Sequence, residues 1–209
     1  MDGIRLKLEE FLEDYSKLII LGIGNDIRGD DGLGPYIINR LSNLNEDVSN
    51  NGSLEDTYID NPINLEDIIH FSNNVLLING GSVPENFTGP IKKLNPSHII
   101  IIDACLMNMN PGEVNIVSKE NIVNISVSTH SMSLAYLIKY LESSSDDITV
   151  NKDSNLEINE NSNLEIHNDF KMLFVGIEPE IMDLSFDLTD SVKESCDNLI
   201  NIIDDLIQE

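Results

Sequence analysis

Length, composition and charge narrow the possible functions before any motif is considered. The chain has 209 residues, enough for one α/β domain with a complete core, and 41% of them are hydrophobic. Twelve Lys and Arg against 37 Asp and Glu give a formal net charge of -25. That charge repels nucleic acid and anionic membranes, so we expect neither as a partner and favour a basic protein or a cation, although acidity also serves solubility alone.

The cysteines and the start of the chain bear on its compartment. Cys105 and Cys196 form no CxxC pair, which excludes a zinc ribbon and a thioredoxin-like site. Residues 1–15 are acidic and amphipathic, unlike a signal sequence, and no apolar run approaches the ~20 residues that span a bilayer. We therefore expect a cytoplasmic protein with free thiols. Because no long apolar stripe remains once core faces are assigned, we also expect a monomer.

Short apolar runs alternate with helical stripes along the first half of the chain. A short helix is expected over residues 1–14, and the run LIILGIG at 18–24 predicts a buried strand that enters a tight turn. A helical stripe follows at 36–41. The run VLLI at 75–78 predicts the second strand, and Pro84 opens a short helix.

The second half repeats this alternation. The β-branched run Ile99–Asp103 is the strongest strand signal in the chain, and residues 114–117 alternate like a half-exposed strand. A helical stripe at 134–141 precedes the last buried strand, at 172–177, and a terminal helix at 189–208. Continuously apolar strands that alternate with helices predict an α/β fold, a three-layer αβα sandwich with a mostly parallel twisted sheet.

Two polar segments interrupt this pattern. Residues 42–74 are rich in Asn, Asp and Ser, with a weak helix expected near Leu65–Phe71. Residues 143–169 contain few core-forming side chains, and the pentapeptide SNLEI occurs in them twice, at 154–158 and 162–166. We interpret both as surface insertions in a single domain that spans residues 1–209.

Three candidate site residues follow predicted strands or precede a predicted helix. Asp31 comes after the first strand, Asp103 ends the third, and His130 lies just before the helical stripe at 134–141. Ligand sites in open α/β sheets form at the carboxyl ends of strands, and two carboxylates with one imidazole suit a divalent first-row metal. Spacing alone leaves other roles open, because Asp commonly caps helices and a histidine at a helix start can be structural.

Other classes of site fit less well. The glycines of Gly22-Ile23-Gly24 begin a dinucleotide fingerprint, but Ile27 replaces its third glycine and the adjacent Asp30 and Asp31 would repel a pyrophosphate. The sequence contains no GxxxxGK[ST], HExxH or GxSxG motif. An aspartic-protease dyad needs two carboxylates that share a proton, and the Asp-Thr/Ser-Gly signatures of that class are absent.

Six segments together resemble the [NiFe]-hydrogenase maturation proteases, and are closest to the branch that matures formate-hydrogenlyase-type and methanogen hydrogenases. The segments occur in the family's order and cover nearly all of residues 17–208 outside the insertions. They are GIGNDIRGDDGLG (22–34), GGSVPEN (80–86), IIDA (101–104), NPGE (110–113), STHSM (128–132) and GIEP (176–179). One departure is Asn79, where many relatives carry Asp.

This resemblance implies a five-stranded sheet between helices and an endopeptidase of a single dedicated substrate. That substrate is a nickel-loaded hydrogenase large-subunit precursor, from which a short C-terminal extension is removed. The metal-binding and catalytic trio of the family matches Asp31, Asp103 and His130, with nickel delivered on the substrate, and Asn25 and Thr129 would orient the trio. The alternative is a non-proteolytic nickel-checkpoint protein on the same fold.

Overall fold

The computed structural model describes residues 1–44, 68–118, 131–143, 148–150, 156–158 and 170–208. Strands and helices alternate in these segments, as the sequence predicts. The strands are β1 (Leu18–Ile23), β2 (Ile68–His70), β3 (Val75–Gly81), β4 (His98–Ala104), β5 (Val114–Ser118), β6 (Ile148–Val150), β7 (Leu156–Ile158) and β8 (Lys171–Ile177). The helices are α1 (Asp2–Leu12), α2 (Leu33–Leu44), α3 (Thr88–Leu94), α5 (Ser131–Glu142) and α6 (Asp190–Gln208), with short 3₁₀ turns η1 (Gly29–Gly32) and η4 (Pro84–Phe87).

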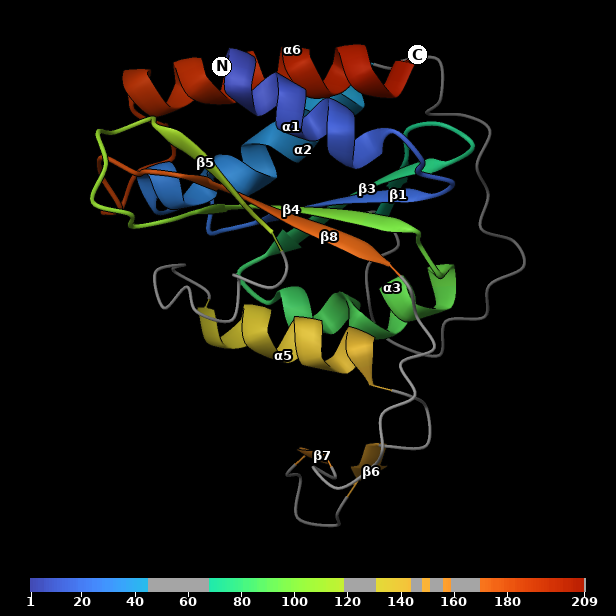
Figure 1. Cartoon of the computed structure of the whole chain (residues 1–209). Helices are drawn as coiled ribbons and strands as arrows, with labels where there is room; N and C mark the ends of the chain where they lie inside the picture. The colour runs from blue at the N-terminus through green and yellow to red at the C-terminus, as the bar shows by residue number, and fades with distance from the viewer. Residues whose placement is uncertain (45–67, 119–130, 144–147, 151–155, 159–169, 209) are drawn as a thin grey trace.

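The central sheet has six strands in the order β2-β3-β1-β4-β8-β5 (Figure 1). The inner strands β3, β1, β4 and β8 are parallel, and the edge strands β2 and β5 each run antiparallel to their neighbour. The expected mostly parallel sheet is therefore confirmed. The expected number of five strands is wrong, because β2 adds a sixth.

The additional strand lies in the segment that was expected to be an insertion. Ile68–His70 pairs with Leu76–Ile78 of β3, so the helix expected near Leu65–Phe71 is wrong over those three residues. A three-residue edge strand is too short to show the alternation that identifies strands, and its pairing with β3 rather than local propensity determines its conformation.

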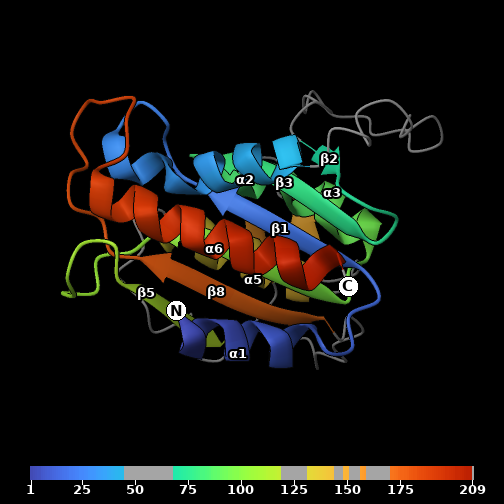
Figure 2. The same ribbon diagram turned by 90° about the horizontal axis from the view of Figure 1, so that it is seen from above.

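Helices cover both faces of the sheet, which gives the expected three layers (Figures 1 and 2). One face packs against α1, α2 and α6, and the other packs against α3 and α5. Alternate residues of the same strand enter the two layers: Ile100 and Ile102 of β4 face α2 and α6, whereas Ile99 and Ile101 face α3 and α5. Two-sided burial explains why these strands are continuously apolar.

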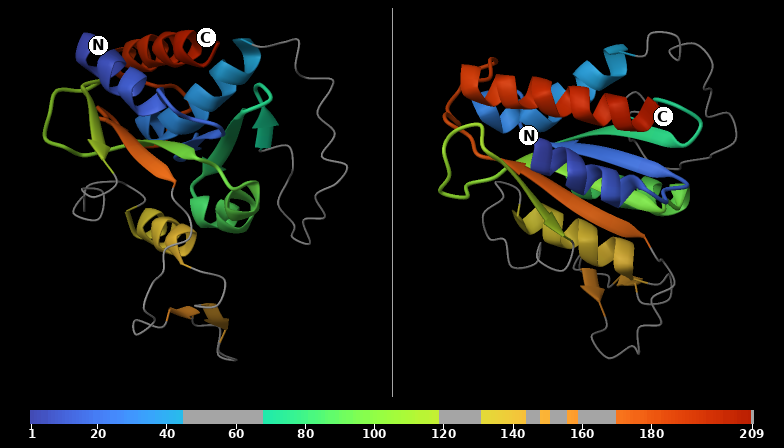
Figure 3. Two further views of the ribbon diagram at one scale, coloured as in Figure 1. Left: turned by 45° about the vertical axis from the view of Figure 1, so that its right-hand side comes forward. Right: turned by 45° about the horizontal axis from the view of Figure 1, so that its top comes forward.

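The second insertion contains regular structure in its described residues. Strands β6 and β7 pair antiparallel as a separate two-stranded sheet, with Thr149 opposite Glu157 (Figure 3).

None of the helices in the described part of the chain is long and apolar enough to cross a membrane. The thiols of Cys105 and Cys196 are both buried and unpaired, as expected.

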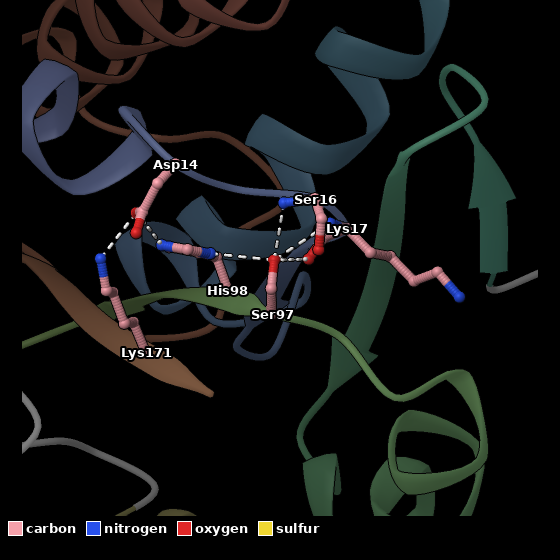
Figure 4. Close-up of polar contacts among 6 residues, drawn as sticks. All are labelled: Asp14, Ser16, Lys17, Ser97, His98 and Lys171. Carbon is pink, nitrogen blue, oxygen red and sulfur yellow. Dashed lines mark hydrogen bonds and ion pairs between the residues drawn. The ribbon is translucent and has the colours of Figure 1, made fainter. Parts of the chain in front are cut away.

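A polar network closes the amino-terminal edge of the sheet (Figure 4). The Ser97 hydroxyl accepts the backbone N–H of Lys17 at 3.0 Å and lies 3.0 Å from His98 Nδ1. His98 Nε2 lies 3.3 Å from the Asp14 carboxylate, which also accepts a 2.6 Å hydrogen bond from Lys171 Nζ. These contacts join the segment after α1 to the starts of β4 and β8, at the edge opposite the carboxyl ends of the parallel strands.

Candidate active site

The turn after β1 carries Asp31 back against the end of the strand. Gly24 has φ +146°, and its N–H donates to the carbonyl of Gly81 at 2.9 Å. The N–H of Asn25 donates to the carbonyl of Asp31 at 3.1 Å, which closes the turn around η1. Asp31 is only 1% exposed as a result. The turn thus fixes a buried carboxylate at the carboxyl edge of the sheet.

Asp103 reaches the same edge from the adjacent strand. Gly22 of β1 pairs with Ile102 of β4, so Asp103 is level with Ile23, where the chain leaves β1. Strand β1 has β3 on one side and β4 on the other, and the connection through α2 leads from β1 to β3. Asp31 and Asp103 therefore lie where the strand order reverses, the position at which open α/β sheets bind ligands.

Alternation along β4 sets the direction of the Asp103 side chain. Asp103 has the same parity as Ile99 and Ile101, which face α3 and α5, and it is fully buried. Helix α5 begins at Ser131, and Figure 1 shows that start at the end of the sheet where β8 ends. The side chain of Asp103 thus extends into the layer that contains α5.

One carboxylate oxygen of the pair lacks a partner within the described residues. Asp31 Oδ1 is buried and has no hydrogen bond there. Burying a carboxylate oxygen without a hydrogen bond is costly, so this atom requires a partner beyond the described residues, for which another part of the chain, water, a metal ion or a ligand is suitable. An oxygen of this kind at the sheet edge where a second buried carboxylate, Asp103, also lies fits a cation-binding site.

The sequence did not identify the role of Asp30, which is structural. Its fully buried carboxylate accepts the N–H groups of Glu180 and Ile181, both at 2.9 Å, and of Thr189 at 2.7 Å. The Thr189 hydroxyl also lies 3.1 Å from Asp30 Oδ1. Asp30 therefore anchors the loop between β8 and α6 onto η1, a role that only the three-dimensional structure reveals.

Glu178 at the end of β8 is a second buried carboxylate that the sequence analysis missed. Its Oε2 accepts the N–H of Met107 at 2.5 Å and of Met109 at 3.3 Å, and its backbone N–H donates to Glu113 at 2.9 Å. These hydrogen bonds from Met107 and Met109 fix the loop that follows Asp103 against Glu178. The local sequence around Glu178 gives no indication of this role, because the partners of its carboxylate lie some 70 residues earlier in the chain.

The remaining predicted site residues divide into two groups. His130 and Thr129 lie outside the described residues, and within the described part no cluster of three His, Cys, Asp or Glu side chains could hold a metal ion. Asn25 uses its Oδ1 to accept the N–H of Ile27 at 3.2 Å, and Asn79 likewise accepts the N–H of Gly81 at 3.1 Å. Both asparagines thus shape backbone turns at the carboxyl edge.

Known proteins with a similar sequence identify the family. A Methanocaldococcus jannaschii protein described as a hydrogenase maturation protease is 33% identical over 198 residues, which cover 95% of this chain and 92% of that protein. The chain belongs to the hydrogenase maturation protease family. The family model described as "Hydrogenase maturation protease" matches residues 63–152 of this protease. The Escherichia coli K12 hydrogenase 3 maturation protease is 25% identical over 182 residues, 87% of this chain and 85% of the relative.

The fold of this maturation protease agrees with that assignment. The crystal structure of the [NiFe] hydrogenase maturation protease HycI from Thermococcus kodakarensis KOD1 superposes with a TM-score of 0.63. The match covers 97% of this chain and 99% of that one, at 20% sequence identity. Membership of the family makes the protein a peptidase, a hydrolase, and the superposition confirms the αβα fold expected from its sequence.

Cys105 is the thiol nearest to the candidate site of this protease. It follows Ala104 at the end of β4 and is 1% exposed. Burial, together with the negative charges of Asp103 and Glu178, raises the pKa of Cys105 to about 12. Since the thiolate is the nucleophilic form, this shift disfavours Cys105 as a nucleophile at neutral pH.

Proposed function

We propose that this protease removes a short C-terminal extension from a nickel-loaded [NiFe]-hydrogenase large-subunit precursor. In this proposal Asp31, Asp103 and His130 contact the nickel that the substrate carries. The observation that supports it most directly is the pair of buried carboxylates where the strand order reverses, one with an oxygen unpartnered within the described residues. Family membership supports the reaction, since the relatives are maturation proteases.

The chemistry of the donors supports a metal carried by the substrate. Carboxylate oxygens and an imidazole nitrogen are suitable ligands for a divalent first-row metal with open positions. Both carboxylates are buried, and a bound cation offsets the cost of burying their charge. In this proposal the free enzyme offers carboxylate oxygens to the metal of a docked precursor, and Asp31 Oδ1 has no hydrogen-bond partner within the described residues. This gives the protease a means to distinguish loaded from empty precursor.

Hydrolysis then requires a water positioned at the scissile carbonyl. A nickel ion held between enzyme and substrate would act as a Lewis acid towards that carbonyl or water. A carboxylate of Asp31 or Asp103 within hydrogen-bond reach of the water is a suitable general base. The water oxygen bonds to the carbonyl carbon, the C–N bond breaks, and the proton passes to the departing amine.

The position of α5 supports the inclusion of His130. Ser131, the first residue of α5, directly follows His130 in the chain, and α5 begins at the carboxyl edge of the sheet (Figure 1). Asp103 extends into the layer of that helix. Because His130 directly precedes Ser131 in the sequence, the proposal assigns its imidazole to the same metal as Asp31 and Asp103.

Substitutions that keep shape and remove charge test the assignment. Asp31→Asn, Asp103→Asn and His130→Ala are each expected to lower the rate of precursor processing by at least about 100-fold. The matched control is Asp26→Asn, because Asp26 lies in the same turn and is exposed. Circular dichroism and thermal unfolding monitor the fold of each variant. Full activity in a folded Asp31→Asn, Asp103→Asn or His130→Ala variant would remove that residue from the trio.

A further inference from the structure

Three apolar side chains protrude from the loop between β8 and α6. Ile181, Leu184 and Phe186 are 46%, 81% and 82% exposed, and the last two are the most exposed large hydrophobic residues in the described part of the chain. We call these three residues the apolar ridge. Exposed apolar clusters rimmed by polar residues commonly mark sites of protein interaction.

The loop that carries the apolar ridge is fastened to the turn that carries Asp31. The N–H of Gly29 donates to the carbonyl of Ser185 at 2.8 Å, and the N–H of Ser185 donates to the carbonyl of Ile27 at 3.1 Å. The buried carboxylate of Asp30, next to Asp31, accepts the N–H of Ile181 at 2.9 Å. The ridge therefore keeps a fixed position at the rim of the candidate site although its side chains are exposed.

Acidic groups surround the apolar ridge. Glu180, Asp183, Asp187 and Asp190 are all exposed, and residues 178–190 contain no Lys or Arg. The nearby Arg28 uses its Nη2 to donate to the carbonyl of Met182 at 3.2 Å. A partner that covers this surface must offer an apolar depression flanked by basic side chains. A second copy of this chain, which carries the same acidic rim and a net charge of -25, does not fit that requirement.

We propose that the apolar ridge is the docking surface for the large-subunit precursor. Leu184 and Phe186 of the protease insert into an apolar depression on the precursor, and Lys and Arg side chains of the precursor line the margin of that depression. This inference rests on the proposed function and identifies how the same site selects its substrate. Docking on a ridge fixed to η1 brings the scissile segment to Asp31 without any contact between the ridge and the reacting atoms. The ridge thus contributes to substrate affinity, and the trio contributes to turnover.

This separation of roles predicts a specific kinetic pattern. Loss of contacts that are equal in the ground state and the transition state raises KM and leaves kcat unchanged. The double variant Leu184→Ser with Phe186→Ser is therefore expected to raise KM for the nickel-loaded precursor at least tenfold, with kcat within twofold of wild type. Because both side chains are more than 80% exposed, the thermal unfolding midpoint should be unchanged.

A matched double variant controls for the general loss of surface hydrophobicity. Leu6 on α1 and Tyr136 on α5 are 66% and 56% exposed and lie on helices away from the apolar ridge. The variant Leu6→Ser with Tyr136→Ser should keep the wild-type KM. The variant Asp183→Asn with Asp187→Asn should raise KM at low salt and flatten its dependence on ionic strength, because these charges contribute through long-range attraction.

The outcomes separate this inference from the proposed function. If wild type cleaves the loaded precursor and the Leu184→Ser/Phe186→Ser variant has an unchanged KM, the docking surface is wrong and the proposed function stands. If wild type cleaves no loaded precursor, the proposed function itself fails. Sedimentation analysis tests whether a second copy of this chain covers the ridge instead. If wild type is a dimer and the Leu184→Ser/Phe186→Ser variant is a monomer with unchanged KM, the ridge serves self-association and the inference is overturned.

Discussion

A Cβ atom on Gly24 would lie 1.9 Å from the carbonyl oxygen of Asp31, closer than any side chain can approach. This contact shows how tightly the turn after β1 folds back, and it explains the glycine. Gly24 also has φ +146°, which a side chain rarely tolerates. The position of the Asp31 carboxylate therefore depends on a residue that contributes no side chain to the site.

Substitution of Gly24 by alanine should displace that turn. We expect Gly24→Ala to lower the free energy of unfolding by about 3 kcal/mol and to reduce processing activity strongly, because the carbonyl of Asp31 must move. Chemical denaturation and the processing rate measure the two effects. Gly3→Ala is the control, since a Cβ there meets nothing within 4 Å and alanine favours the helix. A Gly24→Ala protein with wild-type activity would contradict the role of this turn.

The adjacent aspartates should respond differently to the same change. Asp30→Asn weakens a buried carboxylate that binds three backbone N–H groups, so we expect a loss of about 2–4 kcal/mol of stability. Asp31→Asn should leave stability nearly unchanged or raise it, since Asp31 Oδ1 has no hydrogen bond within the described residues. Urea unfolding of both variants tests this contrast. Equal destabilisation would mean that Asp31, too, is chiefly structural.

Glu178 should influence catalysis through the loop that follows Asp103. In Glu178→Gln the acceptor for Met107 and Met109 loses its charge, so we expect faster hydrogen exchange at those two amides and a modest loss of kcat, about threefold to tenfold. Glu194→Gln, an exposed change on α6, serves as the control. Unchanged exchange at both amides in Glu178→Gln would show that the carboxylate does not hold the loop.

His98 should make stability depend on pH. Burial, followed by the positive charge of Lys171, lowers the pKa of His98 below its ordinary value of 6.5, although Asp14 opposes this shift. The unfolded chain therefore binds a proton more readily than the folded one between the lowered pKa and 6.5, and stability falls as pH falls through that range.

Comparison with His98→Leu isolates this contribution. The thermal midpoint of wild type should drop more between pH 7.5 and 5.5 than that of His98→Leu, whatever the difference at pH 7.5. Asp14 affects stability in a separate pH range. The hydrogen bond from Lys171 lowers the pKa of Asp14, so the stability that this carboxylate contributes is lost only as the pH falls below 3.8, the ordinary pKa of Asp. Parallel pH curves for the two proteins would show that His98 does not cause the dependence.

Sequence patterns predicted the inner strands well because two-sided burial leaves a clear signal. The β-branched run at Ile99–Ile102 could form little other than a buried strand. Strand β2 was missed because only its pairing with β3 makes Ile68–His70 a strand. The edge position of Asp31 and Asp103 was likewise foreseeable, since both follow strand signals.

The sequence could not show which of the acidic residues are structural and which belong to the candidate site. Asp30 and Asp31 are adjacent and chemically identical. Their roles differ because a loop 150 residues further along the chain donates its N–H groups to the carboxylate of Asp30 and, within the described residues, not to that of Asp31. Glu178 similarly acts on a loop some 70 residues before it. Such long-range hydrogen bonds leave no local pattern in the sequence. The role of His130 stays a prediction.

This protease is predicted to cleave only a precursor that carries nickel, and one measurement tests that specificity most directly. Purified protein is mixed with the large-subunit precursors of the host's [NiFe]-hydrogenases, with and without nickel loading, and the C-terminal mass is followed by mass spectrometry. We predict that a short C-terminal peptide is lost from the loaded form alone. Equal cleavage of the unloaded precursor would contradict nickel recognition, and nickel-dependent binding without cleavage of any loaded precursor would contradict the proposed reaction.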